Sequence, residues 1–173
     1  SSGISLMLVV VGYLWARKIA PKGSWIRTAT FYSVIAIFLE AILGAGLVLL
    51  KHVEMNQSVG RAISISLHLV NTLFLVSTLA TISYFSYRSE EGLKPQGINF
   101  KKYFPREPFF LVCLGAFVLL GMSGAITALG DTLFPAVSLT QGLAQDLAHD
   151  SHFLVKLRIF HPFIAVAWIL LVF

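Results

Sequence analysis

The stretch "ISISLHLVNTLFLVS", residues 63 to 77, lies inside a run from Ala62 to Tyr84 that contains no Asp, Glu, Lys or Arg. An α-helix rises about 1.5 Å per residue, so about 20 apolar residues cross a hydrocarbon core that is about 30 Å thick. The run is therefore long enough to span a bilayer as a helix. One histidine, His68, stands within it, and a membrane span rarely carries such a residue without a role.

The composition of the whole chain is that of a membrane protein. The 173 residues are 57% hydrophobic and 12% charged, with a mean hydropathy of +0.81, which excludes an ordinary water-soluble domain. Two more apolar runs, Thr28 to Leu50 and Pro108 to Gly130, are long enough to cross a bilayer. Shorter runs, Ile4 to Ala16 and Ile159 to Phe173, stand at the ends, and we expect the chain to be a fragment. The sequence predicts an all-α, polytopic transmembrane helical bundle.

The net charge of +5 comes from basic residues that gather in particular loops. By the positive-inside rule, such loops lie on the cytoplasmic side, or on the matrix side of a mitochondrial membrane. This arrangement predicts that His68 and His161 lie toward the outer surface, and it indicates membrane topology rather than binding to nucleic acid. The residues of the two basic loops are Arg17, Lys18, Lys22 and Arg27, and then Arg88, Lys94, Lys101, Lys102 and Arg106.

An internal repeat relates two outward-running spans. "FLEAILGAGLVLLKH", residues 38 to 52, resembles "VLLGMSGAITALGDT", residues 118 to 132, and each holds a patch of small residues. Each segment is followed by a loop and by a returning helix with one histidine, His68 or His161. Small residues let helices approach closely, and duplicated helix pairs are common in membranes. The general likeness of membrane helices remains an alternative explanation.

The two histidines are candidate ligands of haem iron. A histidine in a membrane span normally faces the interior of the bundle and has a polar partner. Neutral imidazole offers one nitrogen lone pair to iron, while its other nitrogen donates to an acceptor. For His68 and His161, a hydrogen bond to a neighbouring helix is the alternative role.

Five further residues carry specific expectations. We expect Glu40 and Asn71 to make hydrogen bonds between packed helices. Arg61 and Arg158 stand at the outer ends of the two histidine spans, where they can pair with haem propionates or simply anchor the helices at the interface. Pro162 disfavours helical geometry at the preceding residue, so it predicts a kink or a helix start there.

The loop before the last span contains a short amphipathic pattern. Leu139, Leu143 and Leu147 recur at every fourth position after Ser138, which is typical of a helix lying in the membrane interface. A lid that packs on its own bundle is the alternative.

A family resemblance covers essentially all 173 residues. It rests on the order and spacing of "SSGISLMLVVVGYLWARK", "EAILGAGLVLL", "LHLVNTLFLVSTL", "SGAITALGDTLFP" and "RIFHPFIAVAW". Together these segments resemble the haem A synthase family of cytochrome oxidase assembly proteins. The resemblance implies eight helices in two pseudo-symmetric four-helix halves, of which this chain covers about helices two to six. Residues 1–87 then belong to the first half, 88–107 form a cytoplasmic or matrix linker, and 108–173 belong to the second half.

The resemblance also implies a function. The protein would be an oxidoreductase that oxidises the C8 methyl group of haem O to a formyl group, making haem A for terminal oxidases. His68 would lie at the substrate haem O and His161 at a resident haem b, with Arg61 and Arg158 near the propionates; no catalytic residue is assigned. The alternative is a non-catalytic, bis-histidine haem b subunit or electron carrier of a respiratory or photosynthetic complex.

The expected surroundings follow from the same resemblance. Partners would be haem, membrane lipids, and haem O synthase or other subunits of a membrane complex, with no nucleic acid. The bacterial inner membrane is expected in preference to the mitochondrial inner membrane.

Overall fold

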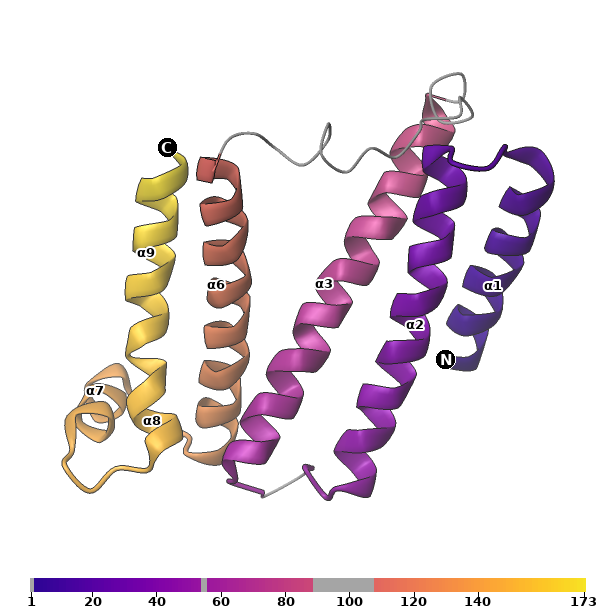
Figure 1. Ribbon diagram of the computed structural model, residues 1–173. Coiled ribbons are helices and arrows are strands. Elements are labelled where there is room, and N and C mark those ends of the chain that lie inside the picture. The colour runs from indigo at the N-terminus through magenta and orange to yellow at the C-terminus, as the bar shows by residue number, and fades with distance from the viewer. Residues whose placement is uncertain (1, 54–55, 89–107) are drawn as a thin grey trace. The chain divides into compact units, whose positions relative to one another are not determined.

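The computed structural model describes residues 2–53, 56–88 and 108–173 (Figure 1). Within these residues the chain is helical and contains no strand, which confirms the predicted all-α, polytopic membrane fold. Four described helical segments are long and apolar enough to cross a membrane: α2, α3, α6, and α8 together with α9. The helices are α1 (Ser2–Ile19), α2 (Trp25–Leu49), α3 (Val59–Tyr87), α6 (Pro108–Leu133), α7 (Leu139–Leu147), α8 (Phe153–Arg158) and α9 (Phe160–Val172).

Serine side chains set the starts of two spans. Helices α2 and α3 each begin three residues before the apolar run that predicted them. Ser24 accepts a hydrogen bond from the backbone N–H of Arg27 at 3.4 Å, and Ser58 accepts one from the N–H of Arg61 at 3.2 Å. A serine at the N-cap satisfies one of the N–H groups that a helix start leaves without a partner. Polar capping residues, rather than the limits of the apolar run, therefore define these two ends.

The last span is interrupted near its histidine. It begins at Phe153, earlier than the predicted Ile159, and α8 gives way to α9 at Ile159. Pro162 is the third residue of α9, where its missing N–H removes no bond within the helix. The prediction of a helix start beside Pro162 is confirmed, and the break places His161 in the first turn of α9.

The chain separates into two compact units. Of the described residues, unit 1 contains 2–45 and 71–88, and unit 2 contains 46–53, 56–70 and 108–173, so that one boundary falls within α2 and another within α3. The linker expected at 88–107 lies outside the described residues except for Arg88. The halves expected at 1–87 and 108–173 stay a prediction.

In unit 1, polar side chains join α2 to α3. Asn71 on α3 donates to the backbone carbonyl of Ala36 at 2.9 Å and to one carboxylate oxygen of Glu40. Thr72 donates to the other oxygen of Glu40. Because hydrocarbon offers no water, such groups must find partners inside the protein. The expected hydrogen bonding of Glu40 and Asn71 between helices is confirmed.

Other polar groups in unit 1 bond within their own helix. The Thr30 hydroxyl donates to the Ile26 carbonyl at 2.9 Å, and the Ser33 hydroxyl donates to the Thr30 carbonyl at 2.8 Å. This pattern is how buried hydroxyls are satisfied without a second helix. Near the end of α3, the ring of Phe85 stacks on Trp25 of α2 with centroids 5.4 Å apart.

In unit 2, α8 packs closely on α6. A Cβ atom added at Gly130 of α6 would lie 3.1 Å from the backbone oxygen of Leu154, so the absent side chain permits this approach. Helices α6 and α9 lie side by side (Figure 1). Trp168 of α9 donates its indole N–H to the carbonyl of Cys113 on α6 at 3.3 Å. The buried core of the unit consists of Ala62, Leu129, Leu133 and Leu154.

The contacts between α2 and α3 predict the effect of Asn71→Ala. The change removes two hydrogen bonds to α2 and leaves Glu40 with one donor fewer, so we expect it to lower the free energy of unfolding by about 1 to 2 kcal/mol. Unfolding in detergent micelles, followed by circular dichroism, measures this change. Ser77→Ala is the matched control, because the exposed Ser77 hydroxyl donates to the Leu73 carbonyl of its own helix and not to α2. Equal stability of both variants would contradict the proposed role of the contacts.

Candidate functional site

The side chain of His161 is held against α6. Its Nδ1 atom lies 3.0 Å from the Oγ atom of Ser123, and the same oxygen lies 2.9 Å from the Leu120 carbonyl, to which the serine donates. The imidazole is half-buried. The helix break at Ile159 places the histidine at the start of α9, opposite this serine.

A glycine provides the space for the imidazole ring. A Cβ atom added at Gly124 would lie 3.2 Å from Cε1 of His161 and 3.8 Å from Nε2, closer to Cε1 than most contacts of this kind. Ser123 and Gly124 lie within residues 118 to 132, the second segment of the internal repeat, and with Ala125 they form its patch of small residues, which the repeat paired with His161. The sequence could have indicated that the patch receives the ring, but we expected only close helix packing there.

His68 and His161 lie at similar depths in their spans. His68 is nine residues beyond Val59 and His161 is eight residues beyond Phe153, so each is roughly 12 to 14 Å from the start of its helical span. Both belong to unit 2, and both are half-buried. Among the described residues, no three of the His, Cys, Asp and Glu side chains gather as a metal site. The roles of His68 and His161 as iron ligands stay predictions.

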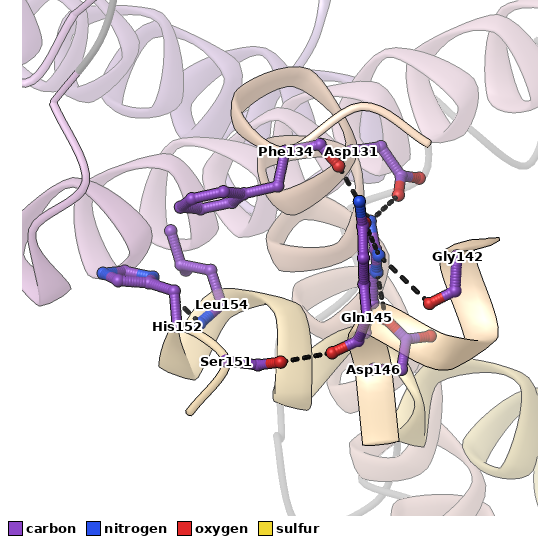
Figure 2. A network of polar contacts seen from close by, with 9 residues as sticks. Asp131, Phe134, Gly142, Gln145, Asp146, Ser151, His152 and Leu154 are labelled. Atoms are coloured by element: carbon purple, nitrogen blue, oxygen red, sulfur yellow. Dashed lines mark hydrogen bonds and ion pairs between the residues drawn. The ribbon is translucent and has the colours of Figure 1, made fainter. Parts of the chain in front are cut away.

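Arg158, the last residue of α8, donates to a set of acceptors in α6, α7 and the loop between them. Figure 2 shows these acceptors, among them Asp131, Gln145 and Asp146. The side chain of Arg158 is 6% exposed, and all five of its N–H donors have partners. The Nε atom donates to Asp146. The Nη1 atom donates to Asp131 at 2.9 Å and to the Phe134 carbonyl at 3.3 Å. The Nη2 atom donates to the Gln145 side chain at 3.0 Å and to the Gly142 carbonyl at 3.5 Å.

This network ties α8 to α7 and to the end of α6. A buried arginine needs a carboxylate partner, and losing Arg158 would leave the Asp146 carboxylate, which is 13% exposed, without its cation. The expected contact between Arg158 and a haem propionate would have to displace one of these acceptors, and it stays a prediction. The sequence analysis missed Asp131 and Asp146, whose only signal was the presence of acids in the same loop as the arginine.

Arg61 faces its own loop at the start of α3. Its Nη1 atom donates to the Asn56 carbonyl at 3.0 Å. In the same region, Nδ1 of His52 lies 2.9 Å from the Oγ atom of Ser64. The expected contact of Arg61 with a propionate stays a prediction.

Helix α7 turns its leucines outward. Ser138 caps the helix by accepting from the N–H of Gln141 at 3.2 Å, and the exposed fractions of Leu139, Leu143 and Leu147 are 88%, 53% and 69%. The face with Gly142, Gln145 and Asp146 is held by Arg158. The predicted helix is therefore present, and its placement in the membrane interface stays a prediction.

Two grooves have linings made largely of carbon. One in unit 1 has a volume of about 690 Å³ and lies between α1, α2 and α3, where Val9, Trp15 and Leu79 line it. The other, in unit 2, has a volume of about 560 Å³ and lies between α6 and α9, beside Phe117 and Trp168. Surfaces of this kind suit the hydrocarbon chain of a lipid or a prenyl group rather than a polar substrate.

These observations define a polytopic helical membrane protein with an imidazole seated at a helix–helix contact. Two relatives, from two strains of Thermus thermophilus, are each named protoheme IX farnesyltransferase. Each is 38% identical to this chain over 168 residues, which is 96% of this chain and 26% of the relative. The chain thus spans about a quarter of the length of these relatives. No protein-family profile and no solved structure matches it significantly.

The relatives correct the expected function. They are named for transfer of a farnesyl group to protoheme IX, so the expected haem A synthase and its oxidation of haem O are wrong. The relatives are named as transferases, so the expected class of oxidoreductase is wrong, and the electron carrier or haem b subunit does not fit the relatives either. The resemblance rested on apolar segments and histidine positions, and these features do not specify the reaction that takes place on a porphyrin.

The Arg158 network predicts the effect of Arg158→Ala. The change leaves Asp146 and several carbonyls without their donor, so we expect the free energy of unfolding to fall by about 3 kcal/mol, with faster amide hydrogen exchange in α7. Exchange measured by mass spectrometry in micelles tests this. The control is Lys156→Ala, which also removes one positive charge but loses only a bond to the His149 carbonyl. Unchanged exchange in α7 would contradict the role of Arg158.

The exposed leucines of α7 predict that this helix lies in the membrane interface. In vesicles that contain brominated lipids, we expect the tryptophan in Leu139→Trp to be quenched, because position 139 is the most exposed of the three leucines. Ala144→Trp places the indole on another exposed face of the same helix and should be quenched less. Fluorescence is compared with the unsubstituted protein, which already contains tryptophans. Equal quenching in the two variants would favour a helix raised above the membrane.

Proposed function

We propose that this chain binds haem within the membrane, as protoheme IX or as its farnesylated derivative. We also propose that it acts in farnesyl transfer to protoheme IX, the reaction for which its relatives are named. The observation that carries the proposal is the imidazole of His161, held by Ser123 and seated over Gly124 on an otherwise apolar helix. The 38% identity over nearly the whole chain supports haem as the molecule bound.

The residues present fit a porphyrin. Histidine is a common axial ligand of haem iron. His161 is half-buried where α9 packs on α6, and the apolar surroundings there suit a flat hydrophobic ring system. His68, at a similar depth in the same unit, is the candidate for a second ligand. Arg61 is the candidate for a propionate, since a guanidinium pairs well with carboxylates. Arg158 is a second candidate, and a propionate there would have to displace one of its present acceptors.

The proposed setting is a bacterial plasma membrane. The chain has described helices that are long and apolar enough to cross a bilayer, and the relatives belong to a bacterium. Haem and lipids are the proposed partners.

Titration with protoheme IX tests the binding proposal. We expect the detergent-purified protein to bind haem saturably, with a shifted Soret band, and the porphyrin extracted after expression to have the mass of protoheme IX or of its farnesylated derivative. His161→Ala should weaken binding by at least about tenfold, because an axial ligand is lost. His149→Ala is the control, since His149 is an exposed histidine of the preceding loop.

Two outcomes separate binding from catalysis. If neither copurified porphyrin nor saturable binding is found, the haem proposal fails. Membranes that contain the protein are also supplied with protoheme IX and farnesyl diphosphate, and the products are analysed by mass. If the protein binds haem but yields no more farnesylated porphyrin than control membranes do, the proposed farnesyl transfer fails and the proposed haem binding stands.

A further inference from the structure

The contacts of Ser123 account for each proton around the imidazole of His161. A serine hydroxyl carries one proton, and a carbonyl carries none to donate. The Oγ atom of Ser123 lies 2.9 Å from the Leu120 carbonyl oxygen, so the hydroxyl proton occupies that contact. The second contact of the same Oγ, 3.0 Å to Nδ1 of His161, must then receive its proton from the ring.

The opposite arrangement is unfavourable. If the hydroxyl donated to Nδ1, the Ser123 and Leu120 oxygens would face each other at 2.9 Å with no proton between them. Two acceptors at that distance repel, and little water is present between apolar helices to relieve the repulsion.

We infer that Ser123 is a positioning residue that fixes His161 in the Nδ1–H tautomer and so presents the lone pair of Nε2 as the ligand atom. The part of this inference that concerns iron rests on the proposed haem binding. In known metal sites, a hydrogen bond to the second ring nitrogen orients the imidazole and strengthens it as a ligand, and losing that bond typically costs 10- to 100-fold in affinity.

Gly124 fixes the position of the ring, as Ser123 fixes its protonation. A methyl group at Gly124 would lie 3.2 Å from Cε1, 3.7 Å from Nδ1 and 3.8 Å from Nε2, so it would push the ring away from α6. Such a shift would lengthen the contact with Ser123 and redirect Nε2. Gly115, on the same helix, has no atom within 4 Å of an added Cβ and so provides a matched position where a methyl group meets nothing.

Nitrogen NMR tests the tautomer without any haem. In protein labelled with ¹⁵N at histidine, the protonated and unprotonated ring nitrogens have well separated shifts, and the His161 signals are assigned as those missing from His161→Gln. We expect the Nδ1–H form of His161 in the unsubstituted protein and in Ser123→Thr, which keeps the hydroxyl. In Ser123→Ala we expect a mixture with the Nε2–H form that is usual for an unconstrained imidazole. An Nε2–H form in the unsubstituted protein would overturn the inference, whatever haem does.

Haem titration tests the consequence for the ligand. We expect Ser123→Ala and Gly124→Ala each to weaken protoheme IX binding by roughly tenfold or more and to shift the Soret band, while Ser123→Thr and Gly115→Ala stay within about twofold of the unsubstituted protein. Circular dichroism confirms that each variant folds. Unchanged affinity and spectrum in both Ser123→Ala and Gly124→Ala would overturn the positioning role, even if the unsubstituted protein binds haem well.

The two proposals fail in different ways. If the unsubstituted protein shows the Nδ1–H form but binds no haem, the proposed function fails, and the tautomer assignment of His161 is supported. If it binds haem and shows the Nε2–H form, the haem proposal is supported and the role of Ser123 fails.

Discussion

The lack of water in a hydrocarbon core is the constraint on which this structure depends. A polar group placed there is stabilised by a partner within the protein, and the described helices provide such partners in two ways. Isolated hydroxyls, such as those of Thr30 and Ser33, bond to carbonyls of their own helix. Groups that cannot do so, such as the Glu40 carboxylate and the His161 imidazole, are met by side chains of a neighbouring helix. Polar contacts therefore mark the specific places where helices must meet.

The spans and several of these polar contacts could be predicted from the sequence. Long apolar runs indicate membrane helices directly, and an unusual polar residue within a run, such as Glu40 or Asn71, predicts a hydrogen bond to another helix. The identity of the partner depends on how the helices pack, so the pairing of Glu40 with Thr72 could not be read from either position. Helices α2 and α3 start three residues earlier than their apolar runs predicted, because each start depends on a single capping serine.

In the candidate site, too, the sequence indicated single residues but not the partners that folding brings to them. Pro162 indicated a helix start, and the small patch around Gly124 indicated a close approach, but only the folded chain brings His161 onto Ser123 and Gly124. Arg158 looked available for a ligand because its acids, Asp131 and Asp146, are 27 and 12 residues away along the chain. The reaction was misjudged for a further reason: many haem proteins combine histidines with apolar helices, whereas what is done to the porphyrin depends on groups that this pattern does not specify.

The Arg158 network also limits how this part of the chain can change during evolution. One guanidinium pairs with two carboxylates that come from separate segments, the end of α6 and helix α7. Replacing Arg158 alone leaves the Asp146 carboxylate, which is 13% exposed, without its cation, whereas Asp131 is 62% exposed and can be solvated by water. A substitution of Arg158 should therefore be inherited together with a change at Asp146, and in an alignment these two positions should vary as a pair, while position 131 varies more freely.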